Sequence, residues 1–256
     1  MTDTPVAVRH SPALAMTSLL RADAQALARS RVSAVLSLVL PLVILVVTTF
    51  GKAGSRLGGA DLIIGLALTL GLLTSCLLGY SLGLAHDREL GVLQRLRVTP
   101  VPTWMIMTSR LVVQIVTNLV ASVIVVIVGA ILHGLTLGAG QVALVLAMAV
   151  IGAAMFLAIG QALVGLVKSA GAINAIGRLL FIVLVLLGIL GSTGVLGDTV
   201  KAISRWSPVG ALMALFSDSV NGVTWSGDDG LALLACFGYI VVFAFVGIRW
   251  FRWDSR

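Results

Sequence analysis

The sequence predicts an all-α membrane protein with six transmembrane helices, and three observations support this fold class. Hydrophobic residues make up 59% of the 256 residues, charged residues only 11%, and the mean hydropathy is +1.12. A soluble domain carries about 25% charged residues, so this chain has too few polar side chains to cover a globule in water. The other two observations are six long apolar segments and an uneven distribution of basic residues.

Each apolar segment is long enough to cross a bilayer, because a helix needs about 20 apolar residues to span the hydrocarbon layer. The predicted spans, in chain order, are Val32–Phe50, Asp61–Ala85, Trp104–His133, Gln141–Val167, Ile173–Leu196 and Leu231–Phe251. An even number of crossings places both termini on the same side. The chain contains no linker and no internal repeat, so residues 1–256 are expected to form one membrane domain.

The basic residues predict the side on which the termini lie. With both termini in the cytoplasm, 13 of the 17 Lys and Arg residues fall in cytoplasmic segments, and only Lys52, Arg56, Lys201 and Arg205 lie outside. Cytoplasmic loops of membrane proteins carry such an excess of positive charge. Orientation in the bilayer therefore explains the net charge of +7, and we expect no nucleic-acid partner.

Two segments are expected to lie along the membrane rather than cross it. Residues 11–31 predict an amphipathic helix on the inner surface, with Leu27 on its apolar face and Arg21 on its polar face. Asp23 falls on the apolar side, which indicates that part of this face contacts protein. Residues 199–220 hold an apolar stretch too short to span and interrupted by proline, which predicts a broken or interfacial segment on the outer side.

Motifs for catalysis, ATP binding and metal binding are absent from the sequence. It contains no G-x-x-x-x-G-K-[ST] phosphate loop, no H-E-x-x-H and no G-x-S-x-G, and its histidines and cysteines are scattered. The chain is therefore expected to be no enzyme and to bind no cofactor of its own. The lack of charges in the middle of the spans also disfavours an ion-coupled carrier.

The polar residues deep within the predicted spans are uncharged amides. Gln114 and Asn118 lie four residues apart on one face of the third span, and Gln161 lies in the fourth. Two interpretations stay open for them: hydrogen bonds between helices, or contacts along a substrate path. Gly79 and Gly83 form a GxxxG pair, which is typical of close helix packing within one protomer or between two.

A charged insert, residues 86–100, interrupts the apolar pattern between the second and third spans. We predict one short helix over residues 86–98, in which Leu90, Leu93 and Leu96 recur every three residues and form an apolar ridge. The Thr-Pro pair that follows ends this helix, because the residue before proline avoids the α region. A solvated loop would explain the arginines but not the ridge, so the pattern favours a docking surface for a cytoplasmic protein.

The insert resembles a signature of the ABC-2 type permeases, the membrane subunits of bacterial ABC exporters of the daunorubicin-resistance kind. The stretch D-R-E-L-G-V-L-Q-R-L-R-V-T-P is similar to the pattern E-R-E-x-G-T-L-E-x-L-x-x-T-P. Asp87, Val92 and Gln94 replace the first Glu, the Thr and the second Glu of that pattern. The N-terminal amphipathic helix, the six spans and the broken segment before the last span also fit the family's layout.

This resemblance implies that the insert is a coupling helix that docks on a separate ATPase subunit. The residues implied at this interface are Arg88, Glu89, Leu90, Gly91, Leu93, Gln94, Leu96, Thr99 and Pro100. The helix over residues 11–31 resembles the family's connecting helix, which also borders the ATPase, here through Arg21, Asp23 and Leu27. ATP and magnesium would be bound by the partner ATPase, and a second permease, identical or homologous, would complete the transporter.

The resemblance also implies a bacterial cell membrane protein with cytoplasmic termini. Because the chain has only two tyrosines and few charges, its walls favour export of a lipophilic drug-like molecule or a lipid. A polysaccharide path would offer more stacking aromatics. Two alternatives stay open: export of a glycan or envelope precursor, and a membrane scaffold or regulatory subunit that transports nothing.

Overall fold

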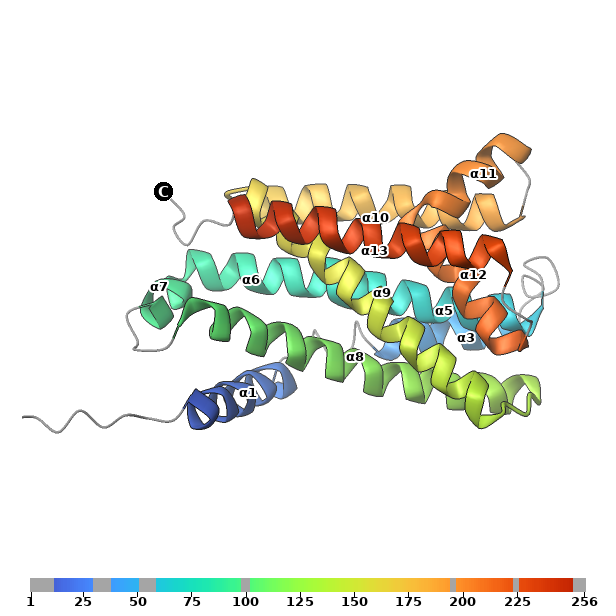
Figure 1. Ribbon diagram of the computed structural model, residues 1–256, viewed down its shortest axis with the longest axis horizontal. Coiled ribbons are helices and arrows are strands. Elements are labelled where there is room, and N and C mark those ends of the chain that lie inside the picture. Colours follow the sequence, from blue (N-terminus) through green and yellow to red (C-terminus); the bar gives the residue numbers. More distant parts are fainter. Residues whose placement is uncertain are drawn as a thin grey trace, which may run out of the picture.

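The chain folds as a bundle of helices in the computed structural model (Figure 1). The structure describes residues 12–29, 38–50, 59–97, 102–193, 197–222 and 226–250. The helices, in chain order, are α1 (Pro12–Arg29), α3 (Leu40–Phe50), α5 (Ala60–Leu72), the π-helix η2 (Leu73–Gly79), α6 (Tyr80–Glu89), α7 (Val92–Arg97), α8 (Thr103–His133), α9 (Ala139–Leu166), α10 (Ala170–Thr193), α11 (Asp198–Trp206), α12 (Pro208–Asn221) and α13 (Gly227–Trp250). No strand occurs in the described ranges, which confirms the all-α class for them.

The bundle has two distinct ends (Figure 1). Helix α7 and the C-terminal end of α13 lie at one end, which we call the α7 end. Helix α11 and the N-terminal ends of α5, α9 and α13 lie at the opposite end, which we call the α11 end (Figure 1). The described part of the charged insert therefore lies at the α7 end, far from α11.

Five helices within the described ranges are long and apolar enough to cross a membrane. They are Ala60–Glu89, Thr103–His133, Ala139–Leu166, Ala170–Gly191 and Gly227–Trp250, and they correspond to the second to sixth predicted spans. Of the first predicted span, Val32–Phe50, the structure describes α3, whose 11 residues reach about 16 Å. Residues 32–37 lie outside the described residues, so the sixth crossing stays a prediction.

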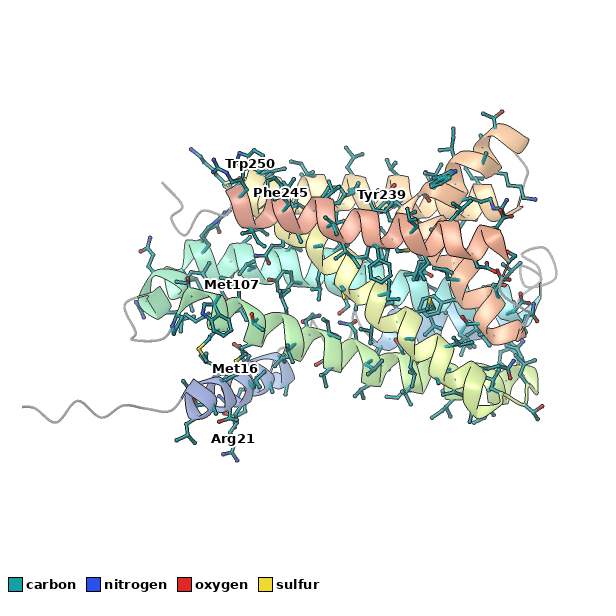
Figure 2. The ribbon with its side chains drawn as sticks, in the orientation of Figure 1. Met16, Arg21, Met107, Tyr239, Phe245 and Trp250 are labelled. Carbon is teal, nitrogen blue, oxygen red and sulfur yellow. The ribbon has the colours of Figure 1, made fainter. Side chains whose placement is uncertain are left out.

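The continuous helix Ala60–Glu89, made of α5, η2 and α6, forms the centre of the bundle. In its most apolar stretch 83% of the residues are buried, against 11% in the corresponding stretch of α13. Helix α13 instead exposes large apolar side chains, among them Phe245 and Trp250 (Figure 2). Apolar side chains exposed along a whole helix fit contact with lipid tails, which are as apolar as leucine.

The π-helical turn η2 interrupts the central helix near its middle. Such turns are rare and occur often at functional sites. Helix α9 packs closely against this turn, because a Cβ added to Gly160 would lie 3.1 Å from the carbonyl oxygen of Cys76. The glycine therefore lets two spans approach each other at the widened backbone of η2.

The amide side chains deep in the bundle make hydrogen bonds near η2. Gln114 Nε2 donates to Ser75 Oγ (3.0 Å), and Tyr80 Oη donates to Gln161 Oε1 (2.6 Å). Asn118 Nδ2 donates to the carbonyl oxygen of Gln114 in its own helix (2.8 Å). Both glutamines therefore make hydrogen bonds between helices, and their contact with a substrate path stays a prediction.

The segment before the last span is broken into α11 and α12, in agreement with the proline in residues 199–220. Ser207 ends α11 and caps α12, where its Oγ accepts a hydrogen bond from Gly210 N (3.0 Å) and Pro208 occupies the first helical position. Most residues of α12 are buried among α5, α9 and α13. The apolar residues of α12 therefore pack inside the bundle, and the position of this segment at the outer membrane surface stays a prediction.

Acidic side chains surround the C-terminal part of α12, where Asp61 of α5 makes hydrogen bonds to it. Asp61 Oδ2 accepts hydrogen bonds from Ser217 Oγ (2.5 Å) and Asn221 Nδ2 (3.1 Å). Asp218, on the same helix, lies close to the carboxylate of Asp229 of α13. Burial, together with the neighbouring Asp229 and Asp61, raises the pKa of Asp218 from its ordinary value of 3.8 to about 6.

Replacing Asp218 with asparagine is expected to remove part of the pH dependence of stability. Because its pKa is higher in the folded chain, although Arg205 acts in the opposite direction, the folded state binds more protons between about pH 4 and pH 6. Stability therefore falls as the pH rises through this window, whereas D218N keeps a polar amide that does not titrate. Unfolding temperatures of detergent-solubilised parent and D218N should diverge across the window, and parallel curves would contradict the shift.

Candidate functional site

The charged insert forms two helical pieces rather than the single predicted helix. Helix α6 ends at Glu89, and α7 begins at Val92 after a turn at Leu90 and Gly91. Gly91 has a φ of 70°, in the left-handed region where glycine carries no steric penalty. The prediction of one continuous helix over residues 86–98 is therefore wrong, because the glycine ends the first helix within it.

The turn at Gly91 also separates the three leucines of the predicted ridge. Leu93 is fully buried in the core, Leu96 is half-buried and Leu90 is 60% exposed. A spacing of three residues aligns side chains only along an unbroken helix. Leu93 packs against its own chain, which corrects its predicted place on an exposed docking ridge, while Leu90 remains accessible.

Arg88 is buried at the base of the insert, with 2% of its surface exposed. Its guanidinium donates hydrogen bonds to three carbonyl oxygens, those of Val164 (2.8 Å), Val167 (2.8 Å) and Lys168 (2.6 Å). These carbonyls lie at the C-terminal end of α9, where backbone acceptors lack partners within the helix and the helix dipole is negative. Arg88 therefore caps α9 and is not accessible to a partner protein.

Glu89 binds the other side of the same turn. Its Oε1 accepts a hydrogen bond from the backbone N–H of Ala170 (2.7 Å), the first residue of α10. A carboxylate is favourable there, because the first N–H groups of a helix lack acceptors and carry partial positive charge. Arg88 and Glu89 thus cap the end of one span and the start of the next. We call this arrangement the clamp, and residues 167–170 the α9–α10 turn.

A second set of charged contacts joins the insert to α8 and α1. Arg110 Nη1 donates to Asp87 Oδ2 (2.6 Å), and Arg110 Nε lies 4.0 Å from Asp23 Oδ1. Ser109 Oγ donates to Asp23 Oδ2 (2.5 Å). The acid on the apolar side of the N-terminal helix therefore contacts protein as predicted, and that protein is the chain's own α8.

The remaining predicted site residues divide by their exposure. Gln94 is exposed on α7, and Leu27 is half-buried on α1. Arg21 projects from the side of α1 away from the bundle (Figure 2). Thr99 and Pro100 lie outside the described residues. Among the described residues of the insert, the surface left to a partner therefore consists of exposed side chains on α7 and on the turn before it.

The α9–α10 turn is the part of the site that sequence reasoning missed. Its groups lie 76 to 81 positions from their partners in the insert. Most of them are backbone atoms, which leave no trace in the pattern of side chains. The one available signal is the polar pair Lys168 and Ser169 between two apolar spans.

The contacts at the α7 end fasten helices to one another. No group of three or more His, Cys, Asp or Glu side chains in the described ranges could hold a metal ion. Arg88, Glu89 and Asp87 instead connect the insert to three other helices through hydrogen bonds and one ion pair. Such an arrangement suits the transmission of movement.

Comparison with known families decides the class of this bundle. A model of the ABC-2 type transporter family matches residues 15–221, which is more than half of the chain. The chain belongs to the ABC-2 type transporter family. The matched residues run from α1 to the end of α12 and include the charged insert. A search of curated proteins found no match.

Membership of the ABC-2 type transporter family makes this multi-pass chain the transmembrane component of an ABC transporter. Components of this family normally lack an ATPase site of their own. Membership therefore implies a separate ATPase subunit as partner, and a lipid bilayer as surroundings.

Proposed function

We propose that this ABC-2 type transporter protein is the membrane subunit of an exporter similar to the daunorubicin-resistance permeases. Two permeases and two ATPases would together move a lipophilic drug-like molecule or a lipid out of the cytoplasm or the inner leaflet. The chain would cross a bacterial cell membrane six times, with the α7 end and both termini in the cytoplasm. The observation that carries this proposal is the clamp, which ties the charged insert to spans on both sides of the α9–α10 turn.

The clamp would let the insert transmit movement to several spans. An ATPase that docks on the α7 end would contact exposed side chains such as Leu90 and Gln94. Movement of the insert would pass directly to α6, and through the clamp to α9 and α10. The ion pair between Asp87 and Arg110 extends this connection to α8. Because packed helices move as rigid bodies, a small displacement at the insert would shift several spans together.

The apolar interior supports a lipophilic cargo. The chain has two tyrosines among 256 residues, and 59% of its residues are hydrophobic. The glutamines deepest in the bundle already hydrogen-bond to other helices. Few polar groups in the described middle of the spans are then left to replace the water around a sugar, and the cost of burying unpaired polar groups there would oppose a glycan.

The proposal predicts that ATP hydrolysis requires a partner subunit. We expect the purified chain to hydrolyse no ATP, because the sequence lacks a phosphate loop. We expect the complex with its co-purifying ATPase, reconstituted in lipid nanodiscs, to hydrolyse ATP faster when lipophilic compounds are added. Stimulation by glycan precursors alone would show that the cargo is a glycan precursor and not a lipophilic compound. An ATP turnover that no compound changes would favour a scaffold that transports nothing.

A further inference from the structure

The glycine pair of the second span packs against no other helix in the described part of the chain. Among the described residues, a Cβ added to Gly83 would meet nothing within 4 Å, and one added to Gly79 would meet only the Thr74 carbonyl oxygen of its own helix, at 3.7 Å. Both glycines instead line a pocket of about 270 Å³ between α1, α6 and α8. The missing side chains therefore create space within the protomer, whereas packing of this pair against a second protomer stays a prediction.

The pocket combines apolar walls with charged groups. Leu27 of α1, Leu84 of α6 and Val113 of α8 supply the apolar side chains. Asp23 and Asp87 supply carboxylates, whose side chains keep 22% and 34% of their surface exposed. A molecule with an apolar body and a polar head would therefore find both kinds of surface within one cavity.

The charges in the pocket favour a positively charged head. Among the described residues, two carboxylates, Asp23 and Asp87, face one guanidinium, that of Arg110. These three groups together carry one excess negative charge, and the imidazole of His86 also lines the pocket. The ring of Tyr80 also lines the pocket, and aromatic faces attract organic cations.

We propose that this pocket binds an amphiphile that carries a positively charged head. Its head would lie near Asp23 and Asp87, and its apolar body would lie over Gly79 and Gly83. Asp87 directly precedes the clamp residue Arg88, so a ligand in the pocket would touch the first turn of the insert. That such a ligand is the transported cargo rests on the proposed function, whereas its binding does not.

The test is binding of the lipophilic cation tetraphenylphosphonium to the full chain in lipid nanodiscs. Gly83→Leu fills the pocket and is expected to weaken binding at least about tenfold. Gly238→Leu is the matched control, because Gly238 on α13 is also open and lies far along the chain from the pocket. Asp23→Asn should weaken binding of the cation but not of tetraphenylborate, an anion of the same shape.

The possible outcomes separate this proposal from the proposed function. Equal affinities for Gly83→Leu and Gly238→Leu would overturn the site, since the cation would then be partitioning into lipid. If tetraphenylborate binds as tightly as tetraphenylphosphonium, the preference for positive charge is overturned, and the cavity is one for membrane lipid. If Gly83→Leu abolishes binding while the cation leaves ATP turnover of the complex unchanged, the site stands and the exporter role of the cation fails.

Discussion

Replacing Arg88 with alanine is expected to destabilise the folded chain by at least about 3 kcal/mol, because hydrogen bonds to charged groups contribute about 1.5–3 kcal/mol each. Three carbonyl oxygens at the end of α9 would lose their donor in a region where Arg88 itself is 2% exposed. The same change should disconnect the insert from two spans, so ATP hydrolysis should no longer respond to cargo.

Thermal unfolding in detergent and limited proteolysis near residues 167–170 measure the first effect, and ATP turnover in nanodiscs measures the second. Arg88→Lys should be intermediate, because an ammonium cannot reproduce the forked geometry of a guanidinium. Arg95→Ala is the matched control, since Arg95 is an exposed arginine of the same insert. An Arg88→Ala variant as stable and as well coupled as Arg95→Ala would show that the clamp contributes neither to folding stability nor to coupling.

The spans and the break before the last one could be predicted because each depends on residues close together in sequence. Apolar length determines the five described spans. The break depends on Ser207 and Pro208. Ser207 accepts a hydrogen bond from a backbone N–H of the first turn of α12, and Pro208 is the first residue of that helix. What the sequence could not show was that α12 is buried, since burial depends on helices from other parts of the chain, among them α5 and α9.

The clamp could not be predicted for two physical reasons. A charged residue in a short loop is ordinarily exposed, so Arg88 looks like one more cytoplasmic arginine. Its acceptors are backbone carbonyls distant in sequence, and backbone groups carry no residue-specific signal. Glu89 was predicted to lie at the ATPase interface, and nothing in its spacing indicates that it caps α10.

The spacing of the three leucines predicts a ridge only if the insert is one unbroken helix. Gly91 adopts a positive φ and changes the direction of the chain, so Leu90 and Leu93 no longer share a face. The glycine was visible in the sequence, but its backbone conformation was not. This difference turns three equivalent leucines into residues with separate roles.

Leu93→Ala and Leu90→Ala are therefore expected to impair different properties, namely folding stability and assembly with the ATPase. Leu93 is fully buried, and truncating a buried leucine costs about 2–5 kcal/mol through lost contacts and the cavity left behind. Leu90 is 60% exposed, so its truncation should change the stability of the isolated chain by less than about 0.5 kcal/mol. If Leu90 packs into a groove on the ATPase, however, its loss should weaken assembly by about 1.4 kcal/mol or more, which is about tenfold.

Unfolding of the isolated chain and co-purification with the ATPase measure the two effects separately. The expected pattern is a destabilised Leu93→Ala chain, and a Leu90→Ala chain that is stable but assembles poorly. Leu234→Ala serves as the control, because Leu234 of α13 is similarly exposed and lies outside both the insert and α1. If Leu90→Ala binds the ATPase as tightly as Leu234→Ala does, the exposed leucine meets lipid or water, and docking must use another surface of the α7 end. If Leu93→Ala alone impairs assembly without loss of stability, the insert opens on binding and presents its buried leucine to the partner.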